Sequence, residues 1–261
     1  MDSTHEALED HIHSFDGLWR GGYWVGDPLD PVRHNDYGFL GYVSVLYATY
    51  HACIRPYIDR ATCALEIGCG RGAWTRAMLD AREIWCLDAL SAEHNGFWNY
   101  VGREHQAKVR YIQVSDFSCS DLPDSHFDYL FSFGVFCHIV KEGQFAYYRN
   151  LWPKLKPGAN CFVMFGDFDK GALAFKHLSR FRISRLTLRA FLSGLRRERW
   201  QRKHNWHEKE NRPPVSGQWY HVSTAETADC LRSLGYEVVS PDIGINLRDP
   251  VVHFRKPSQP C

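Results

Sequence analysis

The sequence lacks the features that mark several large classes of protein. Its nine cysteines include no C-x-x-C pair, which argues against a zinc ribbon or a disulfide framework and favours reduced thiols in a packed core. No apolar run approaches the ~20 residues of a membrane-spanning helix. The polar opening stretch "MDSTHEALEDHIHSF" differs from a secretory signal peptide. We therefore expect a soluble, cytoplasmic protein with no membrane partner.

A strong excess of charge of either sign is also absent. The formal net charge is +1, which argues against a dedicated nucleic-acid binder. Hydrophobic residues make up 44% of the chain and aromatic residues 15%, which argues against wholesale disorder. A chain of 261 residues is long enough for one large α/β domain or for a core with a modest cap.

Apolar runs alternate with helical periodicity along most of the chain. The runs predict strands at 63–67, 83–88, 109–114, 127–133, 159–167, 236–239 and 251–256. Helices are predicted from Tyr42 to near Pro56, over 74–81 and 91–103, over a segment that carries Phe145 and Leu155 and stops before Pro157-Gly158, and over 224–234 behind a capping box of Ser223 and Glu226. This alternation predicts an α/β fold with parallel strands and helices on both faces of the sheet.

A glycine-rich loop follows the first predicted strand. In "ALEIGCGRGAWT" the glycines Gly68, Gly70 and Gly72 satisfy the dinucleotide fingerprint G-x-G-x-x-G/A and also the shorter pattern G-x-G-x-G. Such a turn between a strand and a helix lets backbone amides approach a ligand. Taken alone, it does not distinguish a nicotinamide site from an S-adenosylmethionine (SAM) site.

Residues around the loop favour SAM. Glu66 would repel a pyrophosphate but suits the cationic amino group of a methionyl moiety. Gly72 permits a wider loop for a ligand that lacks phosphates. Asp88 ends the second predicted strand, where an acid can accept the ribose hydroxyls of either cofactor. Asp116 and Phe117, after the third strand, offer an acceptor for the adenine amine and a ring that can cover adenine.

Taken in order, these motifs resemble the class I SAM-dependent methyltransferases over residues 62–168. The matching segments are "LEIGCGRG", "CLDA", "SDF", "FDYLFSFGVFCHI" and "LWPKLKPGANCFV". The resemblance implies a Rossmann-like, mostly parallel sheet of seven strands with helices on both faces, whose last strand, at 251–256, runs antiparallel. The cofactor-binding residues that it implies are Glu66, Gly68, Gly70, Gly72, Asp88, Asp116, Phe117 and Phe133.

The predicted organisation has four parts. Residues 1–60 form a lead-in with a cap helix, and 61–169 form the SAM-binding core. Residues 170–222 form a helical lid or insertion that is rich in arginine, and 223–261 complete the core with a helix and strands.

His138, just past the fourth predicted strand, is the candidate catalytic residue. A neutral imidazole can accept the proton of a hydroxyl nucleophile, and many small-molecule and sugar O-methyltransferases resemble this chain in carrying a histidine at that motif. The competing interpretation is that His138 caps the following helix. The family members that methylate amines or amides carry Asn/Asp-Pro-Pro-aromatic there, whereas this chain has Phe133-Gly134-Val135-Phe136. That difference favours a hydroxyl acceptor.

Aromatic and basic residues outside the core are candidates for acceptor binding. Rings flanked by polar groups suit stacking on a sugar, although plain packing explains them equally well. An arginine-rich lid could bind an acidic or phosphorylated acceptor, although a solvated helix face or a homodimer contact is the more common role. The candidates are Tyr23, Trp24, Arg180, Trp219 and Tyr220.

A D-x-D pair, Asp167 and Asp169, follows the fifth predicted strand. A divalent cation there could bridge substrate hydroxyls, but two acids in a loop are more often simply solvated, so a metal is not favoured.

The leading hypothesis is a SAM-dependent O-methyltransferase that acts on a small polar acceptor, with a sugar or glycan hydroxyl as first choice. The alternatives are a nicotinamide-dependent oxidoreductase, a SAM-binding subunit without catalysis, and an RNA-directed methyltransferase. Glu66 weighs against the first of these alternatives and the near-neutral charge against the last.

Overall fold

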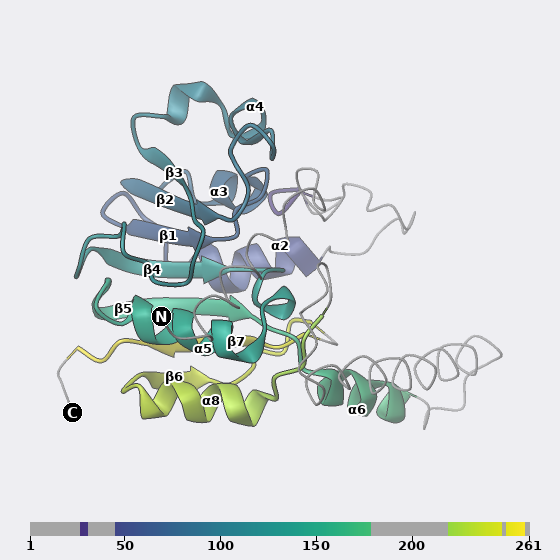
Figure 1. Cartoon of the computed structure of the whole chain (residues 1–261). Coiled ribbons are helices and arrows are strands. Elements are labelled where there is room, and N and C mark those ends of the chain that lie inside the picture. Colours follow the sequence, from purple (N-terminus) through teal and green to yellow (C-terminus); the bar gives the residue numbers. More distant parts are fainter. Residues whose placement is uncertain (1–26, 31–44, 179–218, 247–248, 259–261) are drawn as a thin grey trace.

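The computed structural model describes residues 27–30, 45–178, 219–246 and 249–258 (Figure 1). They contain a seven-stranded sheet in the order β3-β2-β1-β4-β5-β7-β6. Neighbouring strands from β3 to β5 are parallel, and β7 pairs antiparallel to both β5 and β6. The strands are β1 (Cys63–Ile67), β2 (Glu83–Asp88), β3 (Val109–Gln113), β4 (Phe127–Ser132), β5 (Leu155–Met164), β6 (Glu237–Ser240) and β7 (Val251–Arg255). The predicted antiparallel last strand is therefore confirmed.

Helices cover both faces of the sheet, as the alternation of elements predicts. Side chains of β1 alternate between two apolar clusters: Leu65 joins residues of α5 and α8, whereas Ala64 joins residues of α2, α3 and α4. The helices are α2 (Val45–Thr49), which continues as a π-turn (Tyr50–Ile54), α3 (Ala73–Ala77), α4 (Phe97–Val101), α5 (Lys141–Leu151), α6 (Phe168–Leu178) and α8 (Thr224–Ser233), with short 3₁₀ turns at Arg103–His105 and Phe136–His138.

Three predicted helix boundaries were wrong. The helices after the first and second strands are shorter than predicted, at Ala73–Ala77 and Phe97–Val101, because turns replace their ends. The helix predicted to carry Leu155 ends at Leu151, and β5 begins at Leu155 and runs through Pro157. Pro157 is tolerated because the pairing of β5 with β4 shifts register there, so that no ladder hydrogen bond needs its missing N–H.

The capping box at the start of α8 is confirmed. The Ser223 side chain accepts the Glu226 amide, and the Glu226 carboxylate accepts the Ser223 amide at 3.0 Å.

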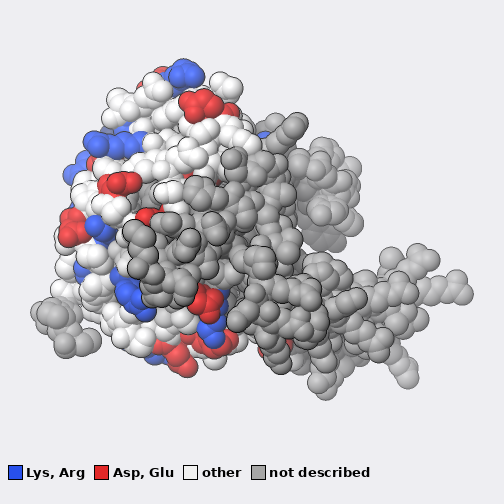
Figure 2. All heavy atoms as spheres, in the orientation of Figure 1, with Lys and Arg blue, Asp and Glu red and all other residues white. Residues whose placement is uncertain are grey.

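No described helix is both long enough and apolar enough to cross a membrane. On the described part of the surface that Figure 2 shows, acidic and basic side chains are interspersed. Most of the basic residues between 176 and 203 lie outside the described part of the chain.

Candidate functional site

A cavity opens at the carboxyl ends of β1, β2 and β4. The strand order reverses between β1 and β4, and ligands of open α/β sheets bind at such a switch point. Three stretches contribute most of the wall: the glycine loop after β1, the turn after β2, and the segment that leaves β4. The glycine loop, the last residue of β2 and the segment after β4 include residues that the sequence analysis selected.

Gly68 and Gly70 line the cavity with backbone conformations that favour glycine. Their φ angles are +73° and +51°, in the left-handed region where a side chain is strained. A Cβ atom at Gly68 would lie 2.1 Å from Cγ2 of Val135, so the loop and the segment after β4 approach each other as closely as glycine allows. The Gly68 amide donates to the Leu87 carbonyl at 2.6 Å and ties the loop to β2.

Gly72 is needed for helix packing. It does not line the cavity, and it precedes α3 with a φ of +93°. A Cβ atom there would lie 2.2 Å from Cγ2 of Val101 on α4. The third glycine therefore lets α3 and α4 meet, a contact that the sequence pattern alone does not reveal. Its direct role toward a cofactor stays a prediction.

Asp88 lies in the cavity wall with its carboxylate held in place. Oδ2 accepts the Gly70 amide at 2.8 Å and Oδ1 accepts the Leu90 amide at 2.9 Å. Burial raises the pKa of Asp88, and these two amides oppose that rise. Cys69 Sγ also lies 3.9 Å from Oδ2, so Oδ1 is the oxygen with more lone-pair capacity left for a ligand hydroxyl.

Asn95 is a cavity residue that the sequence analysis missed. Its side chain donates to the Tyr111 hydroxyl at 2.8 Å, and that hydroxyl donates to the Leu90 carbonyl at 2.7 Å. Asn95 is 4% exposed. This chain of hydrogen bonds fixes the wall beside Asp88, and only the fold brings its members together.

Phe117 lines the same cavity as Asp88. Its ring meets Tyr147 edge-on at 4.9 Å, and its carbonyl accepts the Asn150 side chain at 2.8 Å. Asp116 does not line the cavity. One of its carboxylate oxygens accepts the Ser118 amide at 2.8 Å, so its contact with a cofactor stays a prediction.

Glu66 lies beneath the glycine loop and outside the cavity wall. It is 1% exposed, and its Oε2 accepts the Thr75 hydroxyl at 2.6 Å. Its Oε1 is buried without a hydrogen-bond partner among the described residues. Burial raises the pKa of Glu66 to about 8, and the negative charge of Asp88 adds to the rise. The predicted contact between Glu66 and a methionyl amine remains a prediction.

The raised pKa of Glu66 predicts a stability that depends on pH. Below the ordinary pKa of 4.5, Glu66 is protonated in both the folded and the unfolded chain. Between 4.5 and about 8 the unfolded chain loses this proton while the folded chain keeps it, so the free energy of unfolding falls as pH rises. Glu66→Gln removes this dependence on pH. Urea unfolding at a series of pH values should therefore show that the stability of the variant increases relative to that of the wild type as pH rises through this range. Glu237→Gln, on β6, is the control. If the free energies of unfolding of Glu66→Gln and the wild type change in parallel with pH, Glu66 does not have a raised pKa in the folded chain.

His138 lies in the cavity wall, in the 3₁₀ turn that follows β4. It is 5% exposed, and its ring meets the Trp219 ring edge-on at 5.0 Å. The buried Gln144 side chain donates to the carbonyls of Phe136 and Ile139 at 2.8 Å each. These bonds hold the turn on both sides of His138 and so set where its imidazole lies.

Comparison with known protein families decides what kind of domain this is. Residues 64–158 match a family described as a methyltransferase domain. This part of the chain is a methyltransferase domain, and its fold is that of SAM-dependent methyltransferases. A comparison with curated proteins gives no significant match.

Solved structures share the fold of this methyltransferase domain at low sequence identity. A SAM-dependent methyltransferase from Mesorhizobium loti is 16% identical over 81% of this chain and 98% of its own, with a TM-score of 0.53. A chain of the complex between the Haloferax volcanii Trm112 methyltransferase activator and a methyltransferase is 13% identical over 82% and 89%, also with a TM-score of 0.53. The mitomycin 7-O-methyltransferase MmcR is 18% identical over 83% and 55%, with a TM-score of 0.50.

Phe133 completes the wall of the methyltransferase cavity near His138. Its ring lies parallel to that of Phe131 at 6.3 Å and tilted against that of Trp74 at 5.0 Å. Trp74, in α3, also lines the cavity, as do Leu46 and Pro28. No sequence pattern marks Pro28 as a cavity residue.

The predicted acceptor residues divide into two groups. Trp219 contacts the His138 ring, and the Tyr220 amide donates to the Cys137 carbonyl at 2.8 Å. The chain after residue 218 therefore returns beside the methyltransferase cavity, although neither ring is part of its wall. Tyr23, Trp24 and Arg180 lie outside the described residues.

Asp167 and Asp169 lie close to His221, with ligand atoms within 4.8 Å of one another. Four donors already contact the Asp167 carboxylate: the amides of Asp169 and Lys170 on Oδ1, and the amide and hydroxyl of Thr224 on Oδ2. Asp167 thereby caps α6 and joins it to α8. These bonds use the lone pairs that a cation would need, so a structural role explains Asp167 better than a metal does.

Proposed function

We propose that this chain is a SAM-dependent O-methyltransferase that methylates a hydroxyl of a small polar acceptor, a sugar or glycan, with His138 as general base. The observation that carries the proposal is the position of His138, buried in the wall of the same cavity as Gly68, Gly70 and Asp88. One cavity therefore offers both a cradle for the cofactor and a proton acceptor.

The cavity fits the parts of SAM in turn. Asp88 offers its carboxylate to the ribose hydroxyls, and the glycine loop gives a close backbone approach for the methionyl part. Phe117 provides an apolar face beside Asp88 for adenine. The rest of the cavity wall is rich in aliphatic and aromatic side chains. Such a wall suits a nucleoside and a sulfonium better than a pyrophosphate.

When bound, SAM supplies an electrophilic methyl group to a nucleophile aligned with it. This chain's own contribution is to position the acceptor and to accept its proton. His138 accepts the hydroxyl proton as a neutral imidazole. Trp74 and Phe133 pack against each other in the wall of the same cavity and exclude water from it, and the contact with Trp219 restricts the orientation of the imidazole.

Replacing Asp88 with asparagine should weaken cofactor binding. A hydrogen bond to a charged acceptor contributes about 1.5–3 kcal/mol, so the loss of the charge should weaken the affinity for S-adenosylhomocysteine roughly 10- to 100-fold. Calorimetric titration measures this directly. Asp121→Asn, on the loop before β4, should bind like the wild type. An unchanged affinity in Asp88→Asn would remove Asp88 from the site.

Methyl transfer itself is tested by following S-adenosylhomocysteine release against a panel of acceptors. The panel contains sugars, phosphorylated sugars, phenols, amines and RNA. The proposal predicts turnover with a hydroxyl acceptor and none with the matched deoxy compound. Turnover only with amines or RNA, or binding of SAM without turnover on any class, would overturn it in favour of another methyl acceptor or of a non-catalytic subunit.

A further inference from the structure

A second group of polar side chains lies at the amino ends of the strands, away from the cavity at their carboxyl ends. Cys63 begins β1, Glu83 begins β2, and His126 directly precedes β4. The cavity lies at the other ends of these strands, about 13 Å away along the five residues of β1. Methyl transfer as proposed above makes no use of these residues, so they need a separate explanation.

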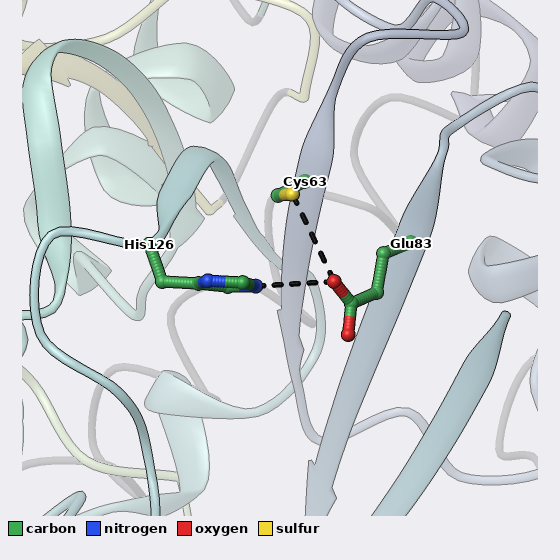
Figure 3. A group of neighbouring side chains, drawn as sticks. All are labelled: Cys63, Glu83 and His126. Carbon is green, nitrogen blue, oxygen red and sulfur yellow. Dashed lines mark hydrogen bonds and ion pairs between the residues drawn. The ribbon is translucent and has the colours of Figure 1, made fainter.

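Two of the side chains converge on one oxygen atom of the third, as Figure 3 shows. The distance from His126 Nε2 to Glu83 Oε2 is 3.1 Å, and Cys63 Sγ lies 3.9 Å from the same oxygen. All three potential ligand atoms lie within 4.8 Å of one another. Neighbouring ligands of a tetrahedral zinc ion, at metal distances of about 2.0–2.3 Å, are about 3.3–3.8 Å apart.

We propose that Cys63, Glu83 and His126 bind one Zn²⁺ ion, with water as the fourth ligand. A thiolate, an imidazole and a carboxylate are the ligand types that zinc takes in proteins. The Glu83 and His126 side chains are 19% and 29% exposed, which gives an ion a route from solvent and leaves room for the water. Cys63 is fully buried and closes the inner side.

The surrounding residues orient these ligands. Glu83 Oε1 accepts the Trp85 indole N–H at 2.6 Å and the Arg110 guanidinium at 3.1 Å. The carboxylate is thereby fixed with Oε2 toward Cys63 and His126. Arg82 donates a hydrogen bond to Cys63 Sγ, and a metal-bound thiolate accepts such a bond equally well. Outer contacts of this kind are typical of metal sites.

Zinc binding at this cluster displaces the Cys63 thiol proton. The Zn–S bond forms as the S–H bond breaks, and the proton passes to the buffer. The ion would join the amino ends of β1 and β2 to the segment before β4, three places that are far apart in the sequence.

Cobalt substitution tests the site without any methyl acceptor. Untagged protein is freed of metal with a chelator and titrated with Co²⁺. We expect one tetrahedral Co²⁺ per chain with a thiolate-to-cobalt charge-transfer band in the near ultraviolet, and Zn²⁺ should displace it. Cys63→Ser should abolish the band. Cys161→Ser is the matched control, because Cys161 is equally buried in β5 and belongs to neither of the clusters of potential ligands found among the described residues.

Two further variants separate metal binding from folding. His126→Gln changes a partly exposed side chain and should lose the stoichiometric ion while keeping the circular dichroism of the wild type. Trp85→Phe, which removes the indole donor to Glu83, should weaken zinc binding about tenfold. A charge-transfer band that survives Cys63→Ser, or wild-type protein that neither binds Co²⁺ nor gains thermal stability with Zn²⁺, means that the cluster is a metal-free hydrogen-bond network. Neither result bears on the proposed methyl transfer.

Discussion

Gly68→Ala should fold poorly and should not bind S-adenosylhomocysteine. The new Cβ would lie 2.1 Å from Cγ2 of Val135, and φ is +73°. Left-handed strain costs about 1–2 kcal/mol and overpacking about 1–3 kcal/mol. Any relaxation must move the glycine loop or the segment that carries Val135, and both line the cavity. Urea unfolding measures the loss of stability, and calorimetry measures the loss of binding.

Gly244→Ala is the matched control for this variant. Its φ is +75°, nearly that of Gly68, but nothing lies within 4 Å of the added Cβ. It should therefore show the left-handed strain alone, with normal cofactor binding. Adding Val135→Gly to Gly68→Ala removes the atoms that clash and should restore part of the binding. If Gly68→Ala binds as well as Gly244→Ala, the close approach of the two segments does not shape the cofactor site.

His138→Ala should lower kcat by about 10²- to 10⁴-fold, the usual contribution of a general base. His138 lies in the cavity wall beside Trp219, and in the proposed arrangement it contacts the acceptor hydroxyl and not the cofactor. Its removal should therefore leave the affinity for S-adenosylhomocysteine unchanged. The rate of SAM turnover with the acceptor measures this loss, and calorimetry measures the affinity.

Two control variants test whether the effect of His138→Ala is specific to this imidazole. His105→Ala, on the 3₁₀ turn after α4, should keep full activity. Gln144→Ala removes the donor to the Phe136 and Ile139 carbonyls, so it keeps the imidazole but loosens the turn that positions it. It should lower kcat less than His138→Ala does. Nearly full turnover by His138→Ala would show that this histidine caps or packs but is no base.

Local sequence patterns predicted the parallel core of the sheet well. The bounds of β1 and β2 match the predicted strands, because both strands are buried on both faces and read as continuous apolar runs. The capping box of Ser223 and Glu226 is a local contact and was also predicted. Asp88, Phe117 and His138 share one cavity because each follows a strand of the same parallel sheet, and carboxyl ends of parallel strands meet at one edge.

Contacts between distant segments explain what the sequence could not predict. Gly72 fits the cofactor pattern, yet its lack of a side chain makes room for Val101. Glu66 ends a strand, yet Thr75 holds its carboxylate beneath the loop. Asn95 is held in the cavity wall by its hydrogen bond to Tyr111, which lies in β3. In each case the partner is set by the packing of two elements, and no spacing within one motif encodes it.

Calorimetric titration with S-adenosylhomocysteine and with NADH tests the central claim most directly. We predict that one S-adenosylhomocysteine binds per chain, that Asp88→Asn weakens this binding, and that NADH gives no saturable heat. Saturable binding of NADH without any binding of S-adenosylhomocysteine would contradict the cofactor assignment, and with it the methyl transfer proposed for this cavity.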